Sequence, residues 1–294
     1  MAELTVGAPE LACSGTCSTK NNQRQRTPLF LNRTRLSLQP FLHPVFMRRF
    51  LSLYFFAASA VAADAQKLPE VPSESIGKPK ELLFADNFER SELGEKWGAV
   101  VPTFTIERGA LKGTQTRFDA PAIDGKAPIK GHNAVIGTDV PTKDSIIEVK
   151  IKFEGATSLS VEFDDRNFTG SHYGHICLVQ VKPNAVILVD QRDGGMNQEI
   201  RQMANDPAKK AERAARLAGR SLTFPLSPEL EQSKWYTLVL ETVGDAMRAS
   251  IDGKPVGYLK SSGIAHPTKS KIELNCGSKD GYFDDVKIWN AASK

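Results

Sequence analysis

Residues 172–194, HYGHICLVQVKPNAVILVDQRDG, decide how this chain folds. Two apolar runs, HICLVQV and AVILVD, flank Lys182-Pro183-Asn184, and a proline followed by an asparagine is typical of a turn. The runs are short and rich in Val and Ile, which favours a β-hairpin over a helix. Neither run alternates cleanly between apolar and polar residues. We therefore expect the hairpin to lie in the middle of a sheet, with both faces covered.

Strand patterns recur on both sides of this hairpin. The segments SIIEVKIKF (145–153) and SLSVEFDD (158–165) alternate apolar with polar residues, which indicates strands with one face toward a core. One helix interrupts the strands over 207–218, where Asp206 and a proline supply a helix start and alanines recur at helical spacing. About ten to twelve strands and one short inserted helix predict an all-β, two-sheet antiparallel sandwich.

The first 65 residues differ from the rest of the chain. From Met47 the sequence reads MRRFLSLYFFAASAVAADAQ, in which two arginines precede an apolar block of fourteen residues and small residues follow. This order is typical of an export signal, a buried core helix being the alternative, and the block is too short to span a bilayer. We predict an upstream, disordered extension over 1–46, a signal peptide over 47–65 and a linker over 66–80. The protein is then secreted or periplasmic.

The charge distribution agrees with this division. Residues 1–65 hold seven basic and three acidic residues, and the remaining 31 basic and 31 acidic residues cancel. A neutral mature chain argues against nucleic acid as a partner. No transmembrane span is expected, and the oligomeric state stays open. Export would allow Cys177 and Cys276 to form a disulfide, and two buried free thiols are an equal alternative.

Three motifs resemble the concanavalin A-like lectin and glucanase jelly rolls: LLFADNFERSELGEKW (82–97), WYTLVLETVGDAMRASIDGKPVG (235–257) and GYFDDVKIWNA (281–291). Within that superfamily the sequence most resembles the secreted bacterial 3-keto-disaccharide hydrolase-type domains, over about residues 81–291. The resemblance implies a jelly-roll sandwich whose first strand, ELLFADNF, pairs with its last, YFDDVKIW. It also implies carbohydrate as the partner.

The resemblance allows one mechanism to be tested. Laminarinase-type jelly rolls carry Glu-x-Asp-x-x-Glu on one strand, but here Glu162 and Asp164 are followed by Asn167 in place of the second glutamate. Without that acid the retaining glucanase mechanism is excluded. Three functions remain: an enzyme that cleaves 3-keto-glycosides by removing a proton next to the ketone, a non-catalytic carbohydrate-binding module, and a structural cell-envelope protein.

Polar residues gather at one end of the predicted hairpin. If the strand that ends near residue 165 and the two hairpin strands form an antiparallel meander, Glu162, Asp164, His175 and Asp190 meet at one edge. We predict His175 and Glu162 as catalytic residues, either of which could be the base, with a metal or Arg192 stabilising an enolate. The predicted substrate-binding residues are Asp164, His172, Tyr173, Asp190 and Arg192. The alternatives are a solvated strand face, structural histidines and a charged turn.

Two further aspartates form a separate pair. Asp86 and Asp284 have the inward parity of their predicted strands, which we expect to be neighbours. Inward carboxylates need a counter-charge or hydrogen-bond donors. A structural Ca²⁺ between them is one possibility, and capping of loop N–H groups is the other.

Overall fold

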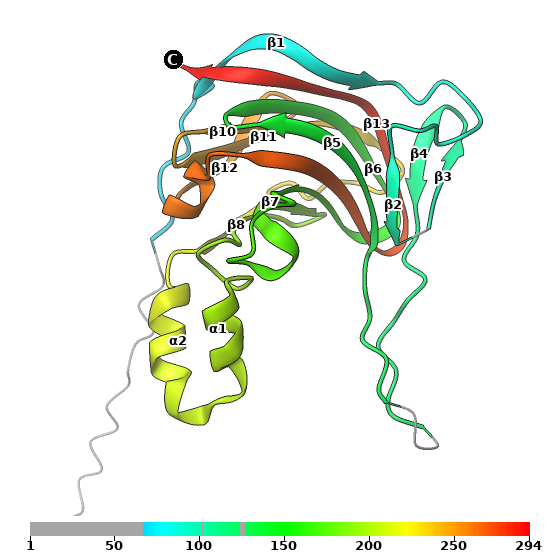
Figure 1. Cartoon of the computed structure of the whole chain (residues 1–294). Helices are drawn as coiled ribbons and strands as arrows, with labels where there is room; N and C mark the ends of the chain where they lie inside the picture. The colour runs from blue at the N-terminus through cyan, green and yellow to red at the C-terminus, as the bar shows by residue number, and fades with distance from the viewer. Residues whose placement is uncertain (1–66, 102, 124–126) are drawn as a thin grey trace, which may run out of the picture. The chain divides into compact units, whose positions relative to one another are not determined.

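The computed structural model describes residues 67–101, 103–123 and 127–294 (Figure 1). The predicted upstream extension and signal peptide lie outside these residues. Within the described part of the chain, no helix combines the length and the apolar character needed to cross a membrane.

Thirteen strands of the described residues join in one antiparallel hydrogen-bonded network. They are β1 (Gly77–Asp86), β2 (Gly98–Val101), β3 (Phe104–Glu107), β4 (Ala110–Gly113), β5 (Ala134–Thr142), β6 (Ser145–Asp164), β7 (His175–Lys182), β8 (Ala185–Asp190), β9 (Ser221–Pro225), β10 (Trp235–Val243), β11 (Ala246–Ile251), β12 (Lys254–Lys260) and β13 (Lys269–Ser293). The helices are α1 (Gln198–Gln202), α2 (Lys210–Leu217) and the single-turn 3₁₀ helices η1 (His172–Gly174), η2 (Met203–Asn205), η3 (Pro207–Lys209) and η4 (Ser262–Ala265).

Two long strands, β6 and β13, belong to both layers of the sandwich. Residues 145–152 of β6 pair with β10, whereas residues 159–164 pair with β7. The first part of β13 likewise pairs with β5, and its last part pairs with β1. The two strands also pair with each other along most of their length. The result is the predicted two-sheet antiparallel jelly roll, except that the two strands expected over 145–153 and 158–165 are one strand.

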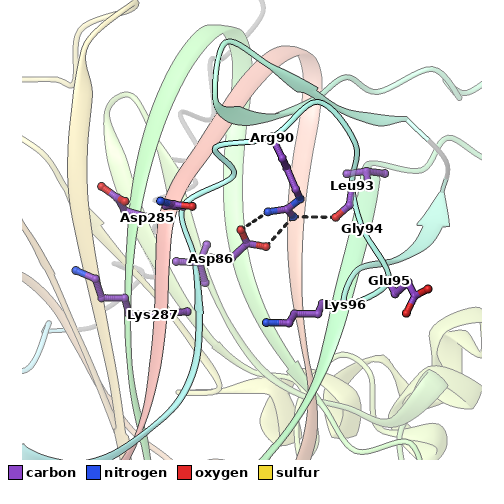
Figure 2. A pocket seen from close by; sticks show the side chains of 11 residues that line it. Asp86, Arg90, Leu93, Gly94, Glu95, Lys96, Asp285 and Lys287 are labelled. Carbon is purple, nitrogen blue, oxygen red and sulfur yellow. Dashed lines mark hydrogen bonds and ion pairs between the residues drawn. The ribbon is translucent and has the colours of Figure 1, made fainter.

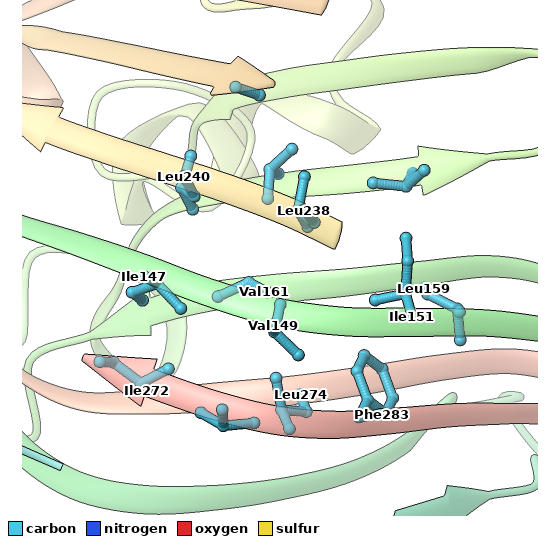
Figure 3. Close-up of a cluster of buried hydrophobic side chains, with 14 of the residues drawn as sticks. Ile147, Val149, Ile151, Leu159, Val161, Leu238, Leu240, Ile272, Leu274 and Phe283 are labelled. Carbon is cyan, nitrogen blue, oxygen red and sulfur yellow. The ribbon is translucent and has the colours of Figure 1, made fainter. Parts of the chain in front are cut away.

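The core lies between the two layers. Ile147, Val149 and Ile151 come from the first half of β6, and Leu159 and Val161 come from its second half (Figure 3). All of these are 1% exposed or less. They pack in one cluster with side chains of β10 and β13, namely Leu238, Leu240, Ile272, Leu274 and Phe283. Full burial of one such side chain stabilises the fold by about 1.5–3 kcal/mol, so the predicted alternation largely accounts for the sandwich.

The hairpin of β7 and β8 lies inside its sheet, as predicted. Pro183 and Asn184 form the turn, and the hairpin is flanked by β6 on one side and β9 on the other. One face is fully buried, with Val179 and Leu188 in the core. The other face is only partly covered, because Leu178 lines an open cleft.

The inserted helix is also confirmed. Asp206 accepts a hydrogen bond from the N–H of Ala208 at 3.0 Å and so caps η3, which continues into α2. The sequence reading missed α1, which is only five residues long. Asn197 caps this helix by accepting hydrogen bonds from the N–H groups of Glu199 and Ile200.

The structure corrects the prediction for the segment before the sandwich. Residues 66–80 were expected to be a linker, but β1 begins at Gly77 and pairs with β13, which confirms that the first and last strands are neighbours. Upstream of β1, the buried Glu241 accepts hydrogen bonds from the N–H groups of Ile76 and Gly77. Arg248 donates to the carbonyl oxygens of Pro72 and Ser73. Specific hydrogen bonds therefore hold this segment against the sandwich.

The cysteines of the sandwich do not form a disulfide. Cys177 and Cys276 are both buried and free. Burial raises the pKa of each thiol to about 12, so both stay protonated and unreactive at neutral pH.

Candidate functional site

An open cleft lies on the face of β6, β7 and β13 that points away from the core. It has a volume of about 1320 Å³, and its floor is made of polar side chains from these three strands. Residues 115–119, 131–133 and 168–174 contribute to its walls, together with α1. Three predicted site residues lie on the floor, Glu162, Asp164 and His175, and two lie at the rim, His172 and Tyr173.

A β-bulge brings His175 to the floor of the cleft. Phe163 of β6 pairs with Cys177 of β7, but the next pair is Asp164 with His175, because the register shifts by one residue between them. Without this shift Ile176 would lie opposite Asp164, and His175 would share the core side with Cys177. The bulge therefore turns a histidine of inward parity toward the cleft.

Glu162, Asp164 and His175 converge on a single point. Nδ1 of His175 lies 2.9 Å from Oε1 of Glu162 and 2.8 Å from Oδ1 of Asp164. The three atoms all lie within 4.8 Å of one another. Among the residues that the structure describes, no other group of three or more His, Cys, Asp or Glu side chains is arranged in this way.

The charges of this cluster depend on one another. Burial alone would lower the pKa of His175, but the hydrogen bonds and negative charge of Asp164 and Glu162 raise it to about 10. Burial favours a raised pKa for Glu162, yet His175 holds this pKa below its ordinary value. For Asp164 burial prevails over the hydrogen bond from His175, so its pKa is raised. His175 thus acts as the cation between two carboxylates.

A second polar strand completes the floor and was missed from the sequence. Lys271, Glu273 and Asn275 of β13 line the cleft beside β6, with Glu273 directly opposite Glu162. The ammonium group of Lys271 donates to Oε1 of Glu273, and Nδ2 of Asn275 donates to Oε2 of Glu162 at 2.7 Å. The segment KIELNC alternates polar with apolar residues, and this signal could have revealed a polar strand face.

Glu273 differs from the other two carboxylates in its surroundings. Burial, together with the negative charge of Asp164, raises the pKa of Glu273 to about 7, while Lys271 opposes the shift. Glu273 is only 4% exposed, although it lines the cleft. The floor thus holds three buried carboxylates with one lysine and one histidine to compensate them.

Two amide side chains beside the cluster have an unpartnered oxygen. Gln191 and Asn275 are 4% and 6% exposed and line the cleft. Oε1 of Gln191 and Oδ1 of Asn275 are buried and accept no hydrogen bond. A buried carbonyl oxygen without a donor is costly, so these two oxygens are available to a donor or an ion that enters the cleft.

Tyr173 forms an exposed aromatic surface at the rim. The residue is 82% exposed, and its backbone has a φ of 51°, in the left-handed region that is unfavourable for tyrosine. The following Gly174 is required, because a Cβ there would lie 2.1 Å from the carbonyl oxygen of Asp165. The ring of Tyr173 lies 4.3 Å from that of His172, centroid to centroid. Burial and the positive charges of Arg201 and His175 lower the pKa of His172, which favours an uncharged ring.

Asp190 and Arg192 lie outside the cleft, contrary to the prediction. Asp190 pairs with Cys177 and shares its core side, where it is fully buried. Its carboxylate accepts hydrogen bonds from the side chains of Arg220 and Ser261 and from the N–H groups of Asp193 and Gly263. Arg192 is bound by Asp193 and donates to the carbonyl oxygen of Ser262. These contacts join the end of β8 to η4, so both residues have a structural role.

The calcium prediction for Asp86 and Asp284 is revised as well. Asp86 lines a smaller pocket of about 610 Å³ near Arg90 and Lys96 (Figure 2). Its carboxylate accepts hydrogen bonds from Arg90 at 2.5 and 2.8 Å, from the indole N–H of Trp97 at 2.7 Å and from the N–H of Phe88 at 2.9 Å. Arg90 therefore supplies a counter-charge to Asp86. Asp284 accepts a hydrogen bond from the N–H of Asp285.

We expect Asp86→Ala to lower the free energy of unfolding by about 2 kcal/mol at neutral pH, because Arg90 and Trp97 lose their acceptor. Burial would raise the pKa of Asp86, but these hydrogen bonds hold it below its ordinary value. The stabilisation is therefore present above the ordinary carboxyl pKa and is lost as the pH falls through the folded-state pKa. The difference between variant and wild type should shrink below about pH 4 in urea unfolding. A thermal response to calcium removal that disappears in Asp86→Ala would restore the calcium site.

Comparison with known proteins identifies the fold. No protein-family model and no curated protein matches the chain. Among solved structures it is similar to an endo-β-1,3-glucanase from Pyrococcus furiosus, with 12% identity and a TM-score of 0.53 over 77% of this chain and 100% of that chain. The fold is the concanavalin A-like jelly roll.

Two other solved structures are similar to the chain. The laminarinase catalytic domain from Thermotoga maritima is 12% identical, with a TM-score of 0.47 over 72% of this chain and 99% of that chain. The carbohydrate-binding module CBM66 from Bacillus subtilis is 14% identical, with a TM-score of 0.39 over 68% of this chain and 98% of that chain. At such identities the similarity concerns the fold, and the activity of this jelly roll has to be argued from its own cleft.

Proposed function

We propose that this jelly roll binds a carbohydrate in the cleft and cleaves 3-keto-glycosides by elimination. One observation carries the proposal: a polar floor with three buried carboxylates, a histidine and a lysine lies in a cleft of sugar size beside the exposed ring of Tyr173. The similarity of the fold to that of an endo-β-1,3-glucanase also supports carbohydrate as the ligand. The sequence resemblance to 3-keto-disaccharide hydrolase-type domains supports the reaction.

The elimination needs a base and a group that stabilises negative charge. A ketone at C3 acidifies the hydrogen on C2, and the base takes that proton while the electron pair forms an enolate. The enolate then forms the C1–C2 double bond, the bond between C1 and the glycosidic oxygen breaks, and the leaving oxygen takes up a proton. The reaction requires no second carboxylate at glucanase spacing, in agreement with Asn167 in place of that acid.

Glu273 is our candidate for the base, in place of the predicted His175 or Glu162. Nδ1 of His175 is held between two carboxylates, and Glu162 is paired with His175 and accepts a hydrogen bond from Asn275. Glu273 is bound by Lys271 through one oxygen and lies in the same cleft. Lys271, rather than the distant Arg192, is then the cation that stabilises the enolate.

The test compares Glu273→Gln with a control glutamate. Glu148→Gln is the matched control, because Glu148 is also on the β6–β13 ladder but forms an ion pair with Lys287 away from the cleft. On a 3-keto-glycoside with a chromogenic leaving group, Glu273→Gln should lower turnover by about 10²–10⁴-fold, and Glu148→Gln should leave it unchanged. Unchanged turnover in Glu273→Gln would contradict the assignment of the base.

A carbohydrate-binding module is the second candidate, favoured by the 82% exposure of Tyr173 at the rim. Aromatic rings of this kind stack on the apolar face of a pyranose. Wild-type protein that binds the keto-glycoside and its reduced analogue equally, without releasing the leaving group, would support the module. In that case Tyr173→Ala should weaken binding by about tenfold, because it removes one stacking contact.

The proposal includes secretion or release to the periplasm. Its basis is the predicted signal peptide over 47–65, which suggests a mature N-terminus at Ala63 or Gln66. Mass spectrometry of the native protein provides the check. Peptides from residues 1–46 in the mature protein would contradict it.

A further inference from the structure

We infer that Glu162, Asp164 and His175 form a binding site for one divalent transition-metal ion on the floor of the cleft. The inference goes beyond the proposed function, since neither carbohydrate binding nor proton removal by Glu273 requires a metal. It rests on the geometry of the three ligand atoms, on the charge of the floor and on the unpartnered oxygens beside it.

The first argument is the spacing of the ligand atoms. Nδ1 of His175 is 2.9 and 2.8 Å from the nearest oxygens of Glu162 and Asp164. Two ligands bound at right angles to an ion at about 2.1 Å lie about 3.0 Å apart, so these distances fit the edges of a coordination shell. A single N–H on Nδ1 cannot point at both carboxylates, whereas one ion can be bonded by all three atoms at once.

The second argument is the charge of the floor. Glu162, Asp164 and Glu273 are each 7% exposed or less, and Lys271 is the lysine beside them. Binding to an ion through Nδ1 would release the proton of His175, and with this imidazole neutral the three carboxylates and Lys271 leave two negative charges. A divalent cation would offset both, and buried charges are stable only when they are paired or bind a metal.

The third argument is independent of the ligand set. Gln191 and Asn275 are more than nine-tenths buried, line the same cleft and keep one side-chain oxygen without a donor. Nδ2 of Asn275 donates to Oε2 of Glu162, which places this amide directly beside the proposed ion. Amide oxygens bind divalent ions or the water molecules that such ions carry, so an occupied site would satisfy them.

The donor set also indicates the class of ion. Calcium prefers six to eight oxygen ligands, whereas one imidazole with two carboxylates suits ions such as Mn²⁺ and Zn²⁺. Three protein ligands leave coordination positions open to the cleft, where a hydroxyl or carbonyl oxygen of a bound sugar could bind.

Metal binding to chelator-treated protein tests the inference, in the absence of any carbohydrate. Titration with Mn²⁺ or Zn²⁺, followed by calorimetry and, for Mn²⁺, by electron paramagnetic resonance, should show one ion bound per chain. His175→Ala and Glu162→Gln should each weaken binding by at least about 100-fold. His132→Ala is the matched control, because this histidine also lines the cleft but is neither part of the three-residue group nor a predicted site residue, and it should bind like wild type.

Two results would overturn the inference: no saturable binding of either ion to the wild type, or unchanged binding in folded Glu162→Gln. If His175→Ala does not fold, as judged by circular dichroism, Asp164→Asn takes its place, since it keeps the size of the side chain and removes its charge. Because binding is measured without carbohydrate, failure here leaves the proposed function standing. Loss of turnover in Glu273→Gln would support Glu273 as the base, and unchanged metal binding in the same variant would show that the metal site does not depend on Glu273.

Discussion

Asp190→Ala should lower the free energy of unfolding by about 3–5 kcal/mol, because it leaves the buried hydroxyl of Ser261 and the buried N–H of Gly263 without their acceptor. Asp190 is 0% exposed and accepts hydrogen bonds from the end of β8 and from η4. The contact is also tight, since a Cβ on Gly263 would lie 1.8 Å from Oδ1 of Asp190. Unfolding in urea, followed by fluorescence and circular dichroism together, measures the loss.

Asp245→Ala serves as the control for this prediction. Asp245 is 49% exposed in its side chain and pairs with Lys260 at 3.7 Å, so its removal should change stability by less than about 1 kcal/mol. An Asp190→Ala variant with wild-type stability and impaired carbohydrate binding would show that Asp190 belongs to the ligand site, as the sequence suggested.

The second large effect is expected for Glu241→Ala, with a loss of about 3–5 kcal/mol. Glu241 and Arg248 are 2% and 4% exposed, and they form an ion pair at 2.6 Å. The variant leaves Arg248 buried without its partner and removes the acceptor for the N–H groups of Ile76 and Gly77. We therefore expect a lower midpoint in urea, and faster cleavage of residues 67–77 by protease in the native protein.

Glu231→Ala is the matched control, because Glu231 is 71% exposed and forms a surface pair with Lys234. It should unfold within about 1 kcal/mol of the wild type and keep the wild-type cleavage rate. Equal stability of Glu241→Ala and Glu231→Ala would mean that the segment before β1 is not held by Glu241.

Alternation predicted the core of this protein well and could have predicted more of its site. Asp190 has the parity of the core residues Val186 and Leu188. Alternation along this strand therefore indicated the core side for Asp190, and not the ligand cluster. The polar face of Lys271 and Glu273 was visible in the same way. The sequence did not show that this polar face lies beside that of β6, because the paired residues of β13 and β6 are more than a hundred positions apart in the chain.

His175 illustrates a different limit. Strict alternation gives it the parity of Cys177 and therefore the core side, yet it faces the cleft. One bulge in the pairing of β6 with β7 causes this change of side. The bulge depends on how the chain between Asp164 and His175 folds back. No pattern within a single strand reports such a shift in pairing. The expected meander thus predicted His175 as a site residue, but not the bulge that turns its side chain toward the cleft.

The continuity of β6 and β13 through both layers has a consequence for motion. In a sandwich of two separate sheets, the sheet that carries a cleft can rock like a hinge on the other sheet. Here such rocking would tear the ladder between β6 and β13, which pairs from Ser145 with Asn290 to Asp164 with Lys271. The amide hydrogens of this ladder should therefore exchange with solvent only in globally unfolded molecules. Entry and exit of a ligand must then depend on the loops at the rim of the cleft, and the floor stays rigid throughout.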